Sequence, residues 1–157
     1  MKVFRISNNK YKTLEGLGGL FAWGRWHNKG VRVIYASENR SLAAWERMVH
    51  IGNLNLLPND LIIMEIEIPE NNIVEVPKKI MVEGWRSYPY SKETTNYGTY
   101  FLKNNLGLAL KVPSVIIQAE SNFIINPNHN DISKCKIIDI KPFTFDKRVI
   151  SLTNNKF

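Results

Sequence analysis

The segment LIIMEIEIPE, residues 61–70, alternates apolar and polar side chains with a period of two. Its apolar positions are Ile62, Met64, Ile66 and Ile68. Glu65 and Glu67 occupy the positions between them. Because successive side chains of a strand point to opposite faces, this segment predicts a β-strand with one face on a core and one face in solvent. A strand needs neighbours, so the rest of the chain must supply a sheet.

Further short, β-rich runs are separated by turn residues along the chain: 31–36, 71–77, 106–114, 115–118, 122–127 and 135–145. Two segments favour helices. The first is 41–52, with Ser41 as a predicted N-cap and Gly52 as a predicted stop. The second is 92–105, in which Gly98 lowers the helix propensity. This mixed order, with strands in the majority, predicts an α+β fold with a mixed, curved sheet flanked by helices.

The length of 157 residues and the hydrophobic fraction of 44% suit one domain over 1–157, ending in a short polar tail. Cys135 is the single cysteine, which excludes an internal disulfide. No run approaches the roughly 18 apolar residues of a membrane span, and the basic N-terminus lacks the apolar core of a signal peptide. We therefore expect a cytoplasmic protein that does not enter a membrane.

The net charge of +7 favours an anionic partner such as a nucleotide, a nucleic acid or an acidic protein surface. The lysines are scattered singly, apart from the pair Lys78 and Lys79, and do not form the basic, aromatic surface of a nucleic-acid binder. We do not expect direct nucleic-acid binding. The three histidines and one cysteine lack the spacing of metal ligands, so no metal site is predicted.

Glu46 is the first candidate for chemistry. The apolar stripe of its predicted helix consists of Leu42, Trp45 and Val49. The helical repeat places Glu46 beside this stripe and away from an outer face that carries Arg40 and Arg47. Such a carboxylate is either a helix-edge salt bridge or a group on the wall of a cleft that faces a ligand. The spacing leaves both interpretations open.

Arg25 and Tyr35 are weaker candidates. Arg25 lies in a predicted loop between Gly24 and Trp26, where a guanidinium could grip phosphate through two hydrogen bonds. Tyr35 ends the inward-facing side of the predicted strand 31–36, at the edge of a sheet where ligands often bind. A tyrosine there could equally cap the core with its hydroxyl in water.

Taken together, these residues resemble the RES-domain toxins of bacterial toxin–antitoxin pairs, a family named for an arginine, a glutamate and a serine. The resemblance covers almost the whole chain, from near residue 3 to near residue 145. It rests on six blocks in family order: FRI (4–6), GRWHNKG (24–30), VIYAS (33–37), SLAAWERMVH (41–50), LKVPS (110–114) and ESNFIINPNHND (120–131). Departures from the family pattern at Trp23, Arg32 and Asn130 affect local loop shape and leave the polar set intact.

By matching motifs, the resemblance implies four catalytic residues: Arg25, Tyr35, Glu46 and Ser114. Three further matches are candidate substrate-binding residues: Arg5, Lys29 and Asn126. In the implied roles, Glu46 stabilises a transition state and Ser114 orients the ligand or Glu46. Arg25 holds a pyrophosphate and Tyr35 borders a ribose. His129 follows Pro127 closely and is interpreted as a structural turn residue.

The resemblance also implies a fold similar to that of ADP-ribosyltransferases and an activity on NAD. The implied reaction is cleavage of the nicotinamide N-glycosidic bond by hydrolysis or phosphorolysis, with ADP-ribose transfer to a protein as an alternative. NAD would be a consumed substrate and no cofactor is expected, since the chain has no Gly-x-Gly-x-x-Gly fingerprint. The implied partner is an antitoxin of the Xre helix-turn-helix type, in a toxin–antitoxin hetero-oligomer. An RNA-directed toxin and an inactive binding module of the same fold remain alternatives.

Overall fold

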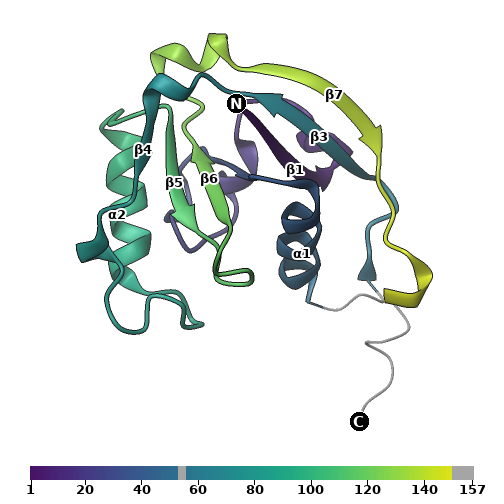
Figure 1. The fold of residues 1–157 in the computed structure, drawn as a ribbon, viewed down its shortest axis with the longest axis horizontal. Coiled ribbons are helices and arrows are strands. Elements are labelled where there is room, and N and C mark those ends of the chain that lie inside the picture. The colour runs from purple at the N-terminus through teal and green to yellow at the C-terminus, as the bar shows by residue number, and fades with distance from the viewer. Residues whose placement is uncertain (53–55, 150–157) are drawn as a thin grey trace.

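A computed structural model describes residues 1–52 and 56–149 and contains one mixed sheet (Figure 1). Its seven strands run in the order β4-β5-β6-β2-β1-β3-β7. The strands are β1 (Lys2–Asn8), β2 (Ile34–Ser37), β3 (Leu61–Glu67), β4 (Ile73–Glu75), β5 (Ala109–Pro113), β6 (Ser121–Ile125) and β7 (Lys136–Pro142). Strands β4 and β5 are parallel and the other neighbours are antiparallel. The α+β prediction is confirmed. The predicted polar tail, residues 150–157, lies outside the described residues.

Two α-helices, α1 (Arg40–Ile51) and α2 (Lys92–Lys103), pack against the same face of this sheet. Phe4 of β1 packs with Ala43 of α1, and Leu110 of β5 packs with Phe101 of α2. Strand register connects the two contacts. Phe4 pairs with Ser37, two residues from Tyr35, and the row through Tyr35 continues through Ile124 to Leu110. Because directly paired residues share a face, the middle of this face lies between the two helices.

The strand predicted at 61–70 is confirmed as β3 and its inward face is the predicted one. Its other face is not in solvent as predicted, because Leu61 and Ile63 pack in a core cluster with Ala43 of α1. Its four inward side chains are Ile62, Met64, Ile66 and Ile68, each at most 6% exposed. They join one core cluster on the sheet face away from the helices, together with Val3, Phe123 and Ile125. In the described residues no helix has the length and apolar character needed to cross a membrane.

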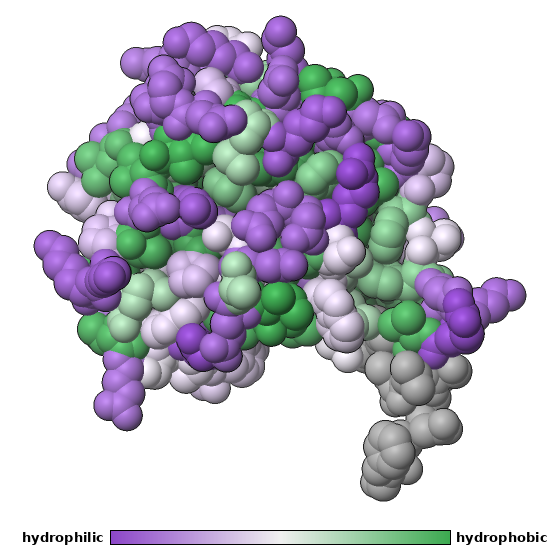
Figure 2. Space-filling model, in the orientation of Figure 1, coloured by the Kyte–Doolittle hydropathy of each residue, from purple (hydrophilic) through white to green (hydrophobic). Residues whose placement is uncertain are grey.

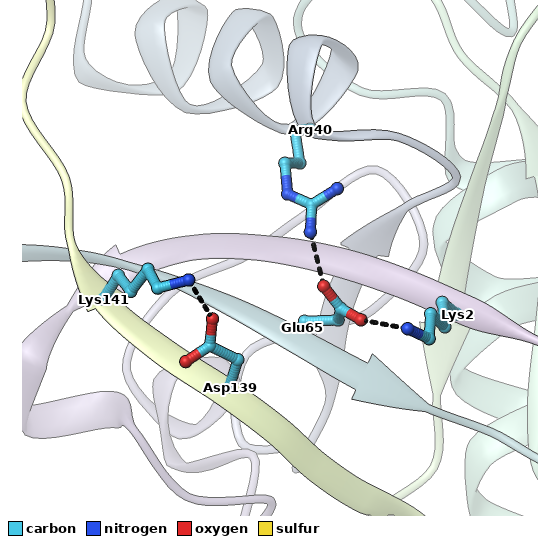
Figure 3. A network of polar contacts seen from close by, with 5 residues as sticks. All are labelled: Lys2, Arg40, Glu65, Asp139 and Lys141. Carbon is cyan, nitrogen blue, oxygen red and sulfur yellow. Dashed lines mark hydrogen bonds and ion pairs between the residues drawn. The ribbon is translucent and has the colours of Figure 1, made fainter.

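Glu65, on the face of β3 that α1 covers, joins the start of α1 to the sheet (Figure 3). Its carboxylate contacts the Arg40 guanidinium and lies 2.6 Å from the Lys2 ammonium. Arg40 also covers the Phe4 ring at 4.2 Å from its centroid. Beside them, Asp139 and Lys141 form a second ion pair. Arg40 therefore has a structural role in docking α1.

The predicted starts of α1 and β2 are wrong. The N-cap of α1 is Asn39 rather than Ser41, because the Asn39 side chain accepts the Leu42 N–H at 2.8 Å. Strand β2 starts at residue 34 rather than 31, since the Val33 N–H bonds the carbonyl of Gly16 and not a neighbouring strand. Gly52 ends α1 as predicted, with a φ of 71°.

The predicted strand 115–118 is also wrong, because this segment is a turn between β5 and β6. The Ile116 and Ile117 N–H groups donate to the Ser114 hydroxyl, at 3.0 and 3.1 Å. A side chain thus takes the backbone hydrogen bonds that a neighbouring strand would supply.

Gly98 sits where α2 meets the segment before β2. A Cβ added at Gly98 would come within 2.0 Å of the Trp26 carbonyl oxygen. The low helix propensity at this position is therefore the cost of a close approach between two backbones.

We predict that Gly98→Ala destabilises the protein by at least about 2 kcal/mol, although alanine is the better helix former, because a backbone atom cannot move aside as a side chain can. Urea unfolding of variant and parent measures this. Gly18→Ala is the matched control, since a Cβ there meets nothing within 4 Å. A stability gain in Gly98→Ala would contradict the close contact.

Candidate functional site

Glu46 lies half-buried on the side of α1 that faces the sheet. The predicted stripe is partly wrong, because Trp45 is 48% exposed and Val49 is 59% exposed. The buried side chains of α1 are Leu42 and Ala43, which precede Glu46 by four and three residues. Glu46 therefore does flank the buried side of the helix, although two of the three predicted stripe residues do not form it.

Arg47 is also placed differently from the prediction. It is half-buried rather than on the outer face, and its guanidinium donates to the Asn8 side chain at 2.7 Å. Burial lowers the pKa of Arg47, and nearby Asp60 partly offsets this effect. Arg47 and Arg40 thus hold α1 to the sheet, and Glu46 is the charged group of this helix that turns toward the space beside β5 and β6.

Two donors from the sheet hold one oxygen of Glu46. The Ser114 hydroxyl donates to Oε1 at 2.8 Å and the Asn122 amide donates to the same atom at 2.5 Å. Ser114 is fully buried, and its oxygen already accepts two backbone N–H groups. Both of its lone pairs are filled, so its single proton can go only to Glu46. In the described parts of the chain no hydrogen bond reaches Glu46 Oε2.

Tyr35, on β2, is half-buried and forms a polar group with two buried residues of the segment before it, Trp26 and His27. Its hydroxyl accepts the Trp26 N–H at 3.2 Å and lies 2.8 Å from His27 Nδ1. Burial raises the pKa of Tyr35 well above its usual range and lowers the pKa of His27. A neutral tyrosine therefore donates to a neutral imidazole, with the ring proton on Nε2.

Arg25 lies in a loop, as predicted, and holds the segment before α2. Its Nη1 donates to the carbonyls of Trp85, at 2.5 Å, and Ser87, at 3.1 Å, and the guanidinium covers the Tyr90 ring at 5.1 Å. Burial lowers the pKa of Arg25, while Tyr90, Glu46 and Tyr35 act in the opposite direction. Arg25, Tyr35 and Glu46 therefore lie within electrostatic range of one another.

Arg5 does not join this group. Its neighbours in β1, Phe4 and Ile6, pack toward α1, and its register partner Met64 belongs to the core on the opposite face. Because side chains alternate along a strand, Arg5 points away from Glu46. It donates to the Tyr35 carbonyl at 2.9 Å, and burial, the largest cause, lowers its pKa to about 10. The cavity that it lines measures about 10 Å³, room for one water at most.

The two other predicted substrate-binding residues contact groups other than Glu46. Asn126 is fully buried, and its side chain bonds the Leu102 carbonyl, the Asn105 side chain and the Asn128 N–H. Lys29 is exposed, with its ammonium 5.4 Å from the Trp23 ring centroid. Structural contacts account for Asn126, whereas Lys29 is available at the surface.

His129 has the structural role predicted for it, since its Nδ1 accepts the Asp131 N–H at 3.1 Å and caps a short 3-10 turn.

Sequence reasoning missed three polar residues: Ser37, Asn122 and His27. Asn122 lies in a predicted strand and alternates with the buried Ile124, so the period of two could have placed it on the helix-facing side. The arrangement can offer one unoccupied carboxylate oxygen to a ligand hydroxyl or to a developing positive charge. Within the described residues no group of three His, Cys, Asp or Glu side chains could hold a metal ion.

The fold and the site define an α+β domain with a carboxylate held between a helix and the centre of a mixed sheet. The chain belongs to the RES domain family, whose match spans residues 2–146. It is 33% identical to the protein named Toxin Res of Yersinia enterocolitica, over 95% of this chain and 99% of that protein. It is also 33% identical to the Prs ADP-ribosylating toxin of Sphingobium sp. strain YBL2, over 87% of this chain and 86% of that protein.

A solved structure shares the fold. It is the Mycobacterium tuberculosis MbcT–MbcA toxin–antitoxin complex, one chain of which superposes with a TM-score of 0.71. The superposition covers 91% of this chain and 84% of that chain at 13% sequence identity.

We predict that the free energy of unfolding falls as pH drops below about 6.5, the ordinary imidazole value. Burial lowers the pKa of His27 in the folded protein. As the pH falls, the imidazole is therefore protonated more readily in the unfolded chain, which stabilises the unfolded state relative to the folded one. Urea unfolding at about pH 7.5 and about pH 5.5 measures the loss.

His27→Asn should show a smaller loss, since its amide oxygen can accept the Tyr35 proton and does not titrate. His50, whose pKa is also lowered by burial, titrates in both proteins and cancels in the comparison. Equal losses in parent and variant would show that His27 does not control this dependence.

Proposed function

We propose that this protein consumes NAD by cleaving the bond between nicotinamide and ribose. The observation that carries the proposal is the half-buried Glu46 carboxylate, with one oxygen held by Ser114 and Asn122 and the other without a hydrogen-bond partner in the described residues. A carboxylate fixed in this way has no need to reorganise when positive charge develops beside it.

Loss of nicotinamide gives the ribose oxocarbenium character, as in glycoside hydrolysis. A fixed negative charge favours this transition state over the ground state and so accelerates the cleavage. In our proposal Glu46 supplies that charge or accepts a hydrogen bond from a ribose hydroxyl, and Ser114 orients the Glu46 carboxylate. Tyr35 borders the nicotinamide ribose, with its own hydroxyl held by His27 and Trp26.

Arg25 is the proposed contact for the pyrophosphate. Its Nη1 is engaged with two carbonyls, so a phosphate would use the other guanidinium nitrogens. The same side chain then holds the segment 85–90 and the substrate together. NAD is a substrate here, and no resident cofactor is part of the proposal.

The acceptor of ADP-ribose distinguishes three candidate activities. Water or phosphate gives a glycohydrolase or a phosphorylase. A protein side chain gives an ADP-ribosyltransferase, which the name of the Sphingobium relative favours. All three share the cleavage step and differ only in the group that attacks the ribose.

We further propose that the protein is a toxin of a toxin–antitoxin pair and acts in the cytoplasm, where it arrests growth by depleting NAD. The relative named Toxin Res and the fold shared with one chain of a toxin–antitoxin complex support this role. Trp45 and Val49, exposed on α1 beside Glu46, give an antitoxin apolar surface to cover. Figure 2 shows hydrophobic patches lying between hydrophilic side chains on the face in view.

Glu46→Gln should lower kcat for nicotinamide release about 10²- to 10³-fold, near 3 kcal/mol, as expected when one preorganised electrostatic group is lost. The glutamine oxygen can still accept from Ser114 and Asn122, so the melting temperature should stay close to that of the parent. Glu67→Gln, at an exposed position of β3, is the matched control.

The assay incubates purified protein with NAD, with and without phosphate and with a cell extract, and identifies products by mass. Free ADP-ribose, its phosphorylated form and a modified protein report the three acceptors. A parent protein that releases no nicotinamide would remove NAD cleavage as the function. Full activity of a folded Glu46→Gln variant would show that the Glu46 charge has no part in NAD cleavage.

Expression of this chain alone should stop growth and lower cellular NAD, and co-expression with the product of a neighbouring Xre-type gene should restore both. The two proteins should elute together on size exclusion, because an antitoxin must occupy the toxin to neutralise it. Trp45→Ala should weaken the complex, with the exposed Tyr100→Ala on α2 as control. Rescue of growth without a complex would contradict direct neutralisation.

A further inference from the structure

Asn122 is the residue of β6 that contacts Glu46, and it lies in the centre of the sheet. It pairs with Ser37 of β2 on one side and with Val112 of β5 on the other. Because paired residues share a face, Ser37 and Asn122 point together toward the helix-covered side. None of the roles derived above involves Ser37, a hydroxyl only 3% exposed.

The hydrogen bonds of Asn122 fix the direction of its amide. The Ser37 hydroxyl donates to Asn122 Oδ1 at 2.7 Å, and Asn122 Nδ2 donates to Glu46 Oε1 at 2.5 Å. If the amide were reversed, Asn122 Oδ1 would face Glu46 Oε1, and the two oxygens would repel each other. Glu46 therefore selects this orientation, because a carboxylate can only accept, and the Ser37 hydroxyl then donates to the amide oxygen and holds it in place.

A second donor changes what Glu46 can do. The last torsion of a glutamate side chain is soft, so one hydrogen bond from Ser114 leaves the carboxylate free to turn. With Ser114 approaching from the end of β5 and Asn122 from β6, Oε1 is held from two directions. The plane of the carboxylate is then set, and with it the position of Oε2.

We propose that Asn122, fixed by Ser37, is a positioning residue that presents Glu46 Oε2 to the ribose of the substrate. Asn122 acts through Glu46 and does not itself touch the reacting atoms. This inference rests on the function proposed above, because it assigns Asn122 a part in the same cleavage step.

Asn122→Ala should lower kcat about 10- to 100-fold and leave KM within about twofold, since misplacing a group by about 1 Å acts on the transition state more than on binding. Asn8→Ala is the matched control. Asn8 also holds α1 to the sheet, through Arg47, but makes no contact with Glu46. A general loosening of α1 would affect both variants, whereas a positioning role affects only Asn122→Ala.

Asn122→Asp gives a readout that a purely structural role would not move. With one proton shared between the introduced aspartate and Glu46, the acid can donate to Oε1 as the amide does. Loss of that proton sets two negative charges about as close as the present contact, so the pair keeps the proton to higher pH than a lone carboxyl does. The kcat of this variant should be highest in acid and fall as the pH rises. The pH–rate profile of the parent should lack this alkaline decrease.

Arg25, Tyr35 and His50 also interact electrostatically with Glu46, but they are unchanged in every variant, so the difference from the parent isolates position 122. Ser37→Ala should lower kcat a few-fold in the parent and have no further effect in Asn122→Ala, because Ser37 acts only through the amide.

Nicotinamide release at several pH values, with melting temperatures, tests all variants in one experiment. Loss of kcat in Asn122→Ala, an added alkaline limb in Asn122→Asp and an unaffected Asn8→Ala support the inference. An active parent whose Asn122 variants keep its kcat and pH profile overturns the inference and leaves the proposed function standing. A parent inactive on NAD overturns the proposed function and this inference with it.

Discussion

The hydrogen bonding of one half-buried carboxylate, Glu46, is the constraint on which the arrangement of this site depends. A charged group at the contact between a helix and a sheet destabilises the fold unless donors meet it. Ser114 and Asn122 are those donors, and they come from neighbouring strands of the sheet. The helix must therefore keep its position relative to β5 and β6. The contacts of Arg40 with Glu65, and of Arg47 with Asn8, hold it there.

Residues 24–50 contain four arginines and two glutamates, and contacts with the rest of the chain explain three of the arginines. Arg40 and Arg47 hold α1 against the sheet. Arg25 donates hydrogen bonds to two backbone carbonyls of the segment before α2. Each guanidinium thus bridges two pieces of chain beside their apolar contact, a task suited to a planar group with several donors. Glu46 differs from them, since one of its oxygens keeps no partner in the described residues.

Local pattern predicts the elements of this fold well, and β3 shows why. The alternation of residues 61–68 depends only on which face meets the core, and each inward side chain is buried. The predictions that were wrong depend on distant partners. The segment 115–118 looks β-rich, but the Ser114 hydroxyl takes its N–H groups, and Val33 bonds Gly16 rather than a strand. Apolar composition alone cannot distinguish a strand from a turn satisfied in this way.

The site itself was predictable only in part, for the same reason. The helical repeat placed Glu46 on the correct flank of α1, because that depends on residues three and four positions away. Its partners Ser114 and Asn122 lie 68 and 76 positions away, and no local period records such a contact. The resemblance to a family supplied Ser114, whereas Asn122 emerged only from the paired strands. Ser37 faces Asn122 across β2 and β6, so the residues that orient the carboxylate are set by strand register. A one-residue slip of β6 would turn Asn122 to the opposite face and leave Glu46 with a single donor.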